Sequence, residues 1–157
     1  MESHKLDAID CRILEVLQRD GRISNVDLAA EIQLSAPQCF RRVRALEERG
    51  VIQGYRAQVR PEALGLSVTA FVSLSIAASA PPKLALLEQQ LRDLPEVLEL
   101  HRVSGGSDYL AKVVAQDLRA LGSLLTERLL QIEGVGDVQS AIALNTLKAT
   151  AALPVPR

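Results

Sequence analysis

The chain has 157 residues, of which 48% are hydrophobic and 24% are charged, and its formal net charge is −1. This composition excludes a disordered polymer and indicates one globular domain of ordinary size or two small ones. A net charge so close to zero also excludes indiscriminate binding to polyanions, so any contact with nucleic acid must rest on a local cluster of basic residues.

The sequence carries no signal for a membrane, for secretion or for a bound metal. No apolar run approaches the roughly 20 residues needed to span a bilayer, and the first ten residues are too polar for the apolar core of a signal peptide. Cys11 and Cys39 are isolated and have neither a CxxC motif nor the spacing of metal ligands. We therefore expect a cytoplasmic protein without membrane contact, metal or other cofactor.

The N-terminal third predicts two helices before its most informative segment. Asp7 is placed to cap the first helix, and Gly21 lies just past its end. Ser24 is placed to cap a second helix of about two turns, and residues 33–34 form a tight turn after it. The apolar positions that we expect to face inward are Ile9, Ile13, Leu14, Val16, Leu17, Val26, Leu28, Ala29 and Ile32.

Residues 35–50 predict a third helix, which carries the basic cluster. Ser35 is placed as its N-cap, Gln38 completes the spacing of a capping box, and Gly50 is placed as a left-handed C-terminal cap. At about 100° per residue, the apolar positions that gather on one face are Ala36, Cys39, Phe40, Val43 and Leu46. The opposite side presents Gln38, Arg41 and Ala45, flanked by Arg42 and Arg44. A short helix, a tight turn and a capped helix with arginines are typical of a helix-turn-helix.

After Gly50, residues 51–52 and 55–59 predict two short strands around Gly54, the hairpin or "wing" of a winged helix-turn-helix. Such a domain places its third helix in the major groove, so we assign base reading to Ser35, Gln38 and Arg41. The residues that we assign to phosphate contacts are Arg42, Arg44, Ser24 and Asn25. Three arginines on an isolated helix also fit a solvated face, but the preceding helix and turn favour binding to double-stranded DNA.

The second part of the chain has a different periodicity. Residues 60–66 (RPEALGL) form a linker, which divides the chain into a domain of residues 1–61 and a domain of residues 62–157. The elements predicted beyond the linker are a strand at 67–76, a helix at 84–94, strands at 97–103 and 109–115, a helix from 117 to about 133 and a strand at 135–144. This order, βαββαβ, is that of a ferredoxin-like α+β domain with two helices on one face of an antiparallel sheet.

The predicted sheet has a second face that the two helices do not cover. Large exposed apolar faces are rare on monomers, so we expect this face to pair with another subunit. The resulting homodimer would present two reading helices to a palindromic operator.

The turn between the two central strands, SGGSD, is the candidate site for a small molecule. Gly105 and Gly106 let a backbone approach a ligand, and Asp108 is placed to meet an amino group. A Gly-Gly-Ser-Asp sequence is also typical of a simple hairpin turn, and the residues alone favour that interpretation.

Long motifs in this chain resemble the Lrp/AsnC family, the leucine-responsive or "feast/famine" transcriptional regulators. They are LDAID before the first helix, DGRISNVDLA into the second, and LSAPQCFRRVRALEERGVIQGY through the third helix and wing. The resemblance continues to the C-terminus. It implies a winged helix-turn-helix followed by a ferredoxin-like domain of the RAM type, an amino-acid effector, and dimers that assemble into tetramers or octamers.

The resemblance also implies an effector site. In the family the SGGSD stretch reads G-D-x-D and lines a pocket between neighbouring dimers; Gly105 and Asp108 match this pattern, whereas Gly106 replaces the first acidic residue. Arg102 stands where an apolar residue is common and is placed to meet a carboxylate or an acidic effector. The other positions that the resemblance brings to the pocket are Ser107, Leu118, Ala141, Ile142 and Ala143.

An enzyme remains the alternative, because sirohaem decarboxylases share this architecture and use histidines around a tetrapyrrole. The two histidines here are His4 and His101, and no P-loop, GxGxxG, HExxH or nucleophile motif is present. The face formed by Gln38, Arg41 and their neighbours has little use in such an enzyme or in a subunit without affinity for DNA. We therefore predict a DNA-binding regulator that is not an enzyme.

Overall fold

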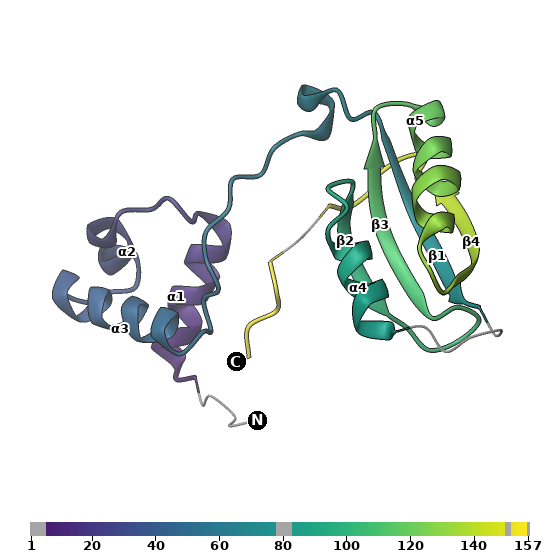
Figure 1. The fold of residues 1–157 in the computed structure, drawn as a ribbon. Coiled ribbons are helices and arrows are strands. Elements are labelled where there is room, and N and C mark those ends of the chain that lie inside the picture. Colours follow the sequence, from purple (N-terminus) through teal and green to yellow (C-terminus); the bar gives the residue numbers. More distant parts are fainter. Residues whose placement is uncertain (1–5, 78–82, 150–151, 157) are drawn as a thin grey trace. The chain divides into compact units, whose positions relative to one another are not determined.

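The computed structural model describes residues 6–77, 83–149 and 152–156. The chain separates into two compact units, Met1–Gln58 with Lys148–Arg157, and Val59–Leu147 (Figure 1). The first unit thus ends earlier than the expected boundary at residue 61, and the last ten residues, which we expected in the second domain, group with the first. Among the described residues, no helix is long and apolar enough to cross a membrane.

Three helices build the first unit: α1 (Ala8–Arg19), α2 (Asn25–Glu31) and α3 (Ala36–Glu48). Their starts agree with the capping residues predicted from the sequence. Asp7 Oδ1 accepts a hydrogen bond from the backbone N–H of Asp10 at 2.8 Å, and Ser24 Oγ accepts one from that of Asp27 at 3.1 Å. Each cap satisfies a backbone donor that the first turn of a helix leaves without a partner.

The core of this unit lies where the three helices meet. Its buried residues are Ile13, Val16, Leu28, Ala29, Ile32, Cys39 and Leu46. Two expectations were wrong: Val26 and Phe40, predicted to face inward, are 67% and 54% exposed. Phe40 follows the fully buried Cys39 by one residue, about 100° around the helix, which carries its side chain from the core to the solvent-facing margin.

The predicted wing strands are wrong. Residues 51–60 run without strand pairing. The backbone N–H groups of Val51 and Ile52 donate to the carbonyl of Leu46 at 2.9 and 3.2 Å, after Gly50 turns the chain with φ +69°. These amides therefore complete the end of α3 and are not free to pair with residues 55–59.

The second unit has the predicted βαββαβ order. After a short 3₁₀ turn at Pro61–Leu64, its main elements are β1 (Val68–Ile76), α4 (Leu84–Arg92), β2 (Val97–Arg102), β3 (Tyr109–Ala115), α5 (Leu118–Ser123) and β4 (Val135–Ile142). A π-helical turn, Leu124–Arg128, and a 3₁₀ turn, Leu129–Gln131, extend α5. The strands lie in the order β2-β3-β1-β4, and every neighbouring pair is antiparallel.

Both helices of this unit lie on one face of the sheet (Figure 1). The alternation predicted for β1 is confirmed, because Ala70, Val72 and Leu74 are buried against the helices. Leu118 at the start of α5 is 63% exposed, since the buried side of the helix begins one turn later at Leu121. The opposite face of the sheet presents Thr69, Phe71, Ser73, Glu99, His101, Leu110, Lys112, Gln139 and Ala141.

Candidate DNA-binding face and effector site

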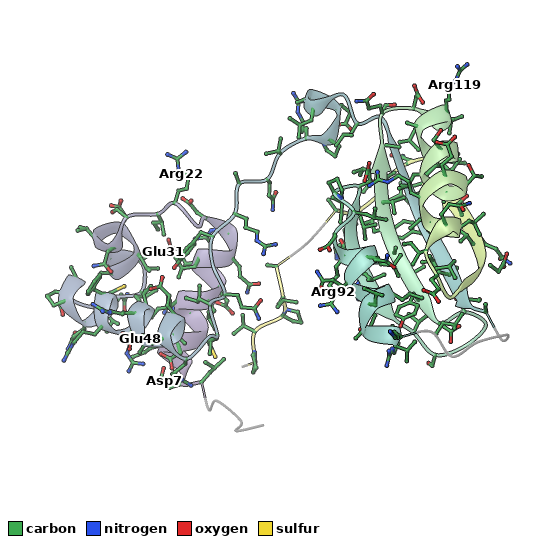
Figure 2. All side chains as sticks on the ribbon, in the orientation of Figure 1. Asp7, Arg22, Glu31, Glu48, Arg92 and Arg119 are labelled. Atoms are coloured by element: carbon green, nitrogen blue, oxygen red, sulfur yellow. The ribbon has the colours of Figure 1, made fainter. Side chains whose placement is uncertain are left out.

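The exposed side of α3 carries two guanidinium groups that can reach a partner molecule. Arg44 Nε lies 3.0 Å from Glu48 Oε1, but both side chains are about two-thirds exposed (66% and 65%), so this pair can open at little cost. Arg41 is also exposed and forms no hydrogen bond or ion pair within the described parts of the chain. Figure 2 shows Glu48 near the end of this helix.

Arg42 has a different environment from its two neighbours. Its Nη1 lies 2.6 Å from Asp7 Oδ2 and 2.8 Å from Asp10 Oδ1, and Arg49 lies 4.0 Å from the other oxygen of Asp10 (Figure 2 labels Asp7). Hydrogen bonds to Asp7 and Asp10 raise the pKa of Arg42, and the N–H of Asp10 together with Arg42 lowers the pKa of Asp7. The guanidinium of Arg42 thus ties α3 to α1, and it is less free than those of Arg41 and Arg44 to contact a phosphate.

The four polar residues predicted at the helix N-termini form hydrogen bonds at the starts of α2 and α3, and one of them joins the two helices. Asn25 Nδ2 donates to the carbonyl of Ala36 at 2.9 Å, which fixes the start of α3 against α2. Gln38 Oε1 accepts from the hydroxyl of Ser35 at 2.9 Å and from its backbone N–H at 3.4 Å. Ser24 caps α2. Ser24, Ser35 and Gln38 are nevertheless exposed, whereas Asn25 is only partly so.

Phe40 is a candidate contact that we missed in the sequence. It is 54% exposed on α3, one turn before Arg44, so both side chains lie on adjacent parts of the same surface. An exposed aromatic ring beside arginines can contact the methyl group of thymine in the major groove. The four-residue spacing of Phe40 and Arg44 already indicated that the two side chains share one side of the helix. The apolar character of Phe40, however, led us to predict it in the core.

The SGGSD turn is held firmly against the end of β1. Asp108 Oδ2 accepts from the backbone N–H of Ile76 at 2.7 Å, and the N–H of Asp108 donates to the carbonyl of Leu74 at 3.0 Å. Gly105 has φ +129°, a conformation that favours glycine. The carboxylate of Asp108 therefore has a structural role in addition to any contact with a ligand.

Arg102 is paired with a carboxylate of its own chain. Arg102 Nη2 lies 2.6 Å from Glu88 Oε1 on α4, and Arg102 Cζ lies 5.7 Å from the centre of the Tyr109 ring. The hydroxyl of buried Tyr109 donates to the same oxygen of Glu88 at 3.0 Å, and this bond together with Arg102 lowers the pKa of Glu88. An acidic ligand would have to compete with Glu88 for the guanidinium of Arg102.

The predicted effector residues fall into two groups at opposite ends of the sheet. Leu74 of β1 pairs with Tyr109, which places Arg102 and the SGGSD turn, with Gly105, Gly106, Ser107 and Asp108, at one end. Ala70 pairs with Ile142, which places Ala141, Ile142 and Ala143 at the other end, and Val68 pairs with Ala115, which places Leu118 there too. At about 3.4 Å per residue along β1, the two groups are roughly 14–20 Å apart. One chain alone does not bring the two groups together.

Comparison with known proteins decides between the candidate functions. Residues 69–153 match the family model of the Lrp/AsnC ligand binding domain, and residues 6–53 match a model of winged helix-turn-helix DNA-binding domains. The chain belongs to the Lrp/AsnC family. It is therefore a transcriptional regulator with an N-terminal DNA-binding domain and a C-terminal ligand-binding domain.

Relatives of this Lrp/AsnC protein cover almost its whole length. The leucine-responsive regulatory protein of Escherichia coli is 41% identical over 143 residues, which are 91% of this chain and 87% of the relative. A transcriptional regulator from Neisseria meningitidis, solved in complex with L-methionine, superposes with a TM-score of 0.91 at 36% identity, covering 96% of this chain and 97% of that one. A feast or famine regulatory protein from M. tuberculosis, also complexed with L-methionine, superposes with a TM-score of 0.89 at 34% identity, covering 97% of this chain and 100% of that one.

The family and its relatives identify a regulator of transcription rather than the sirohaem decarboxylase kept as an alternative. His101 lies 3.6 Å from Glu99 on the open face of the sheet, and Glu99 is in turn 3.0 Å from Lys112. His4 lies outside the described residues. Within the described ranges, no group of three His, Cys, Asp or Glu side chains could hold a metal ion.

Proposed function

We propose that this Lrp/AsnC regulator reads a palindromic operator with the exposed face of α3 and that an amino acid, bound by the second domain, changes its affinity for DNA. The observation that carries the first half is the division among the arginines of α3. Arg42 is paired with two carboxylates, whereas Arg41 and Arg44 extend from the exposed side.

Within that face we assign base reading to Arg41 and Phe40, with Ser35 and Gln38 at the N-terminal end of α3. Arg44 and Ser24 contact phosphates, while Asn25 and Arg42 hold the domain in shape. An arginine reads guanine through two hydrogen bonds, and an aromatic ring reads the thymine methyl group. Phosphate contacts position the domain without carrying sequence information.

Fluorescence anisotropy with the DNA upstream of the protein's own gene, and with a shuffled sequence of equal length, tests this division. Arg41→Ala is expected to weaken specific binding by about 1–3 kcal/mol and to relax base choice. Arg44→Ala is expected to weaken both DNAs alike and to lower the slope of log K against log salt by about 0.9. Equal loss of sequence preference in both variants would contradict the assignment.

An amino acid with an apolar side chain is the effector class that we propose. Two relatives were solved with L-methionine. In this chain the exposed residues at one candidate end include Leu118, 63% exposed, and Ile142, 45% exposed. At the other end Arg102 is paired with Glu88, with which an acidic side chain would have to compete. The two candidate ends are joined when a second copy supplies one of them.

Calorimetric titration of the whole protein with L-methionine, L-leucine, L-glutamate and D-methionine distinguishes the effector classes. We expect binding of the two apolar L-amino acids and a much weaker response to the other two. Tighter binding of L-glutamate would overturn the apolar assignment, and no response to any of the four would overturn this effector class.

The assembly that we propose is a homodimer formed through the open face of the sheet, with further association to tetramers or octamers. Phe71 is 43% exposed at the centre of that face and is flanked by Lys112 and Ala141. Phe71→Asp places a charge there and is expected to lower the mass measured by light scattering. We assign the protein to the cytoplasm, where a prokaryotic regulator meets its DNA.

A further inference from the structure

The C-terminal tail, residues 152–156, belongs to the DNA-binding unit although it follows the effector-binding unit in the chain. The first compact unit comprises Met1–Gln58 and Lys148–Arg157, whereas Val59–Leu147 form the second unit. The chain therefore passes from one unit to the other twice, once after residue 58 and once after residue 147. The second passage has no role in the function proposed so far.

A side-chain amide near the end of α1 holds the tail by two hydrogen bonds. Gln18 Nε2 donates to the carbonyl of Leu153 at 3.2 Å, and the backbone N–H of Leu153 donates to Gln18 Oε1 at 2.6 Å. The amide of Gln18 thus pairs with both backbone polar groups of one residue, as a neighbouring strand would. This recognition does not depend on the side chain of Leu153, which is 75% exposed.

The tail also forms one wall of an apolar groove. Leu14 and Leu17 of α1 and Val51 and Ile52 after α3 line a cavity of about 390 Å³ together with tail residues 153–156. With the tail in place these four side chains are partly buried, and they give the groove its apolar lining. Among the tail residues, Val155 is partly buried.

The sequence of the tail lowers the conformational entropy that is lost when it docks. Proline at positions 154 and 156 fixes φ and restricts the preceding residues to extended conformations, so the peptide loses little entropy when it binds. Its attachment to the chain gives it an effective concentration in the millimolar range. Two hydrogen bonds and a small apolar contact can therefore keep it bound.

We propose that the groove between α1 and residues 51–55 is a binding site for the chain's own C-terminal tail, and that the bound tail is a second connection through which the effector domain acts on the DNA-binding domain. Docking itself does not depend on the proposed function; only its consequence for DNA does. A change at the end of the effector domain would be transmitted to α1, which Arg42 ties to the reading helix α3.

Hydrogen exchange measured on the whole protein by mass spectrometry tests the docking. Truncation after Ala149, and separately Gln18→Ala, are expected to raise exchange in the second half of α1 and in residues 51–55 by roughly tenfold, without changing α2. A synthetic peptide of residues 148–157 at millimolar concentration should restore protection in the truncated protein. Glu15→Ala, an exposed substitution on α1 one turn before Gln18, is the matched control and should change nothing.

Unchanged exchange in both variants, or failure of the peptide to restore protection, overturns the proposal. An equal rise throughout α2 and α3 also overturns it, because that pattern reports global destabilisation instead of release of a local contact. These readouts need neither DNA nor effector, so they remain decisive if the proposed function fails. Where that function holds, the truncated protein should keep its affinity for DNA within about threefold and lose the change that the effector causes.

Discussion

The clearest test of the DNA-binding unit is Arg42→Ala, because the position of Arg42 on the helix and its environment in the structure predict opposite results. A phosphate contact would make the substitution weaken DNA binding and leave stability unchanged. The structure shows instead a guanidinium bound to Asp7 and to Asp10, whose side chain is only 10% exposed. Its removal leaves Asp10 with Arg49 at 4.0 Å as its remaining cation within the described residues.

The expected loss follows from these two contacts. A hydrogen bond to a buried charged group contributes about 1.5–3 kcal/mol, and the bond to Asp7, which is 52% exposed, contributes as a surface pair, about 0.2–1 kcal/mol. We therefore expect Arg42→Ala to lower the free energy of unfolding of the first unit by about 2–4 kcal/mol. Arg44→Ala, which removes an exposed pair, should cost about 0.3–0.5 kcal/mol and is the control.

The pH dependence gives the same test a second readout. The pKa of Asp7 is lowered in the folded state, first by the N–H of Asp10 and then by Arg42. A lowered pKa stabilises the fold above the usual pKa of aspartate, about 3.9, and this stabilisation is lost as the pH falls through the folded value. Because Arg42→Ala removes part of it, the difference in stability between the wild type and the variant should narrow, by the share that Asp7 contributes, as the pH falls below about 4.

Two measurements distinguish a structural ion pair of Arg42 from a phosphate contact. Urea-dependent hydrogen exchange of amides in α1–α3 reports the stability of the first unit separately from the second. Anisotropy titrations at several salt concentrations report the number of phosphate contacts. Unchanged stability together with a salt slope lowered by about 0.9, as expected for Arg44→Ala, would refute our account of Arg42.

Three further substitutions test other parts of the structure. Burial and a 3.0 Å hydrogen bond to Glu47 raise the pKa of Tyr55 to about 12. The raised pKa stabilises the fold below about pH 10, and this stabilisation is lost as the pH rises towards 12. Tyr55→Phe should remove this alkaline loss, as measured by unfolding at several pH values. Leu91→Ala, at a fully buried position of α4, should lower the free energy of unfolding of the second unit by about 2–5 kcal/mol in urea titrations. Asp108→Ala should free the amide of Ile76 and raise its hydrogen-exchange rate. It should also abolish the effector response without weakening DNA binding in the absence of effector. A normal effector response in this variant would show that the SGGSD turn is not part of the effector site.

Features set by neighbouring residues were predictable from the sequence. The starts of α1 and α2 depend on a side chain and a backbone N–H three positions later, and the alternation of β1 depends on residues two apart. Such signals lie within one turn or one pleat, so a single sequence contains all the information. The βαββαβ order follows from them once the turns are recognised.

Features set by distant residues were not predictable. Nothing in residues 35–50 reveals that Arg42 pairs with Asp7, because that contact spans 35 positions. The wing failed for a related reason: residues 51–52 have strand-like side chains, but their N–H groups are bound to Leu46 at the end of α3. The hydrogen-bond partners of the backbone, and not the β propensity of the side chains, thus determined the conformation of residues 51–52.

The effector site shows the same limit at the level of the assembly. From the motif alone, the SGGSD turn and the alanines near Ile142 belong to one pocket, yet the strand register places them at opposite ends of β1. A site that needs both can form only where two copies meet, so the ligand would bind the assembled state more tightly than the separated one. By linkage, the same ligand must then strengthen the assembly, and assembly sets the spacing of the reading helices on DNA. Sensing and DNA recognition would thus be coupled through the contact between copies, with the tail as a second route within each chain.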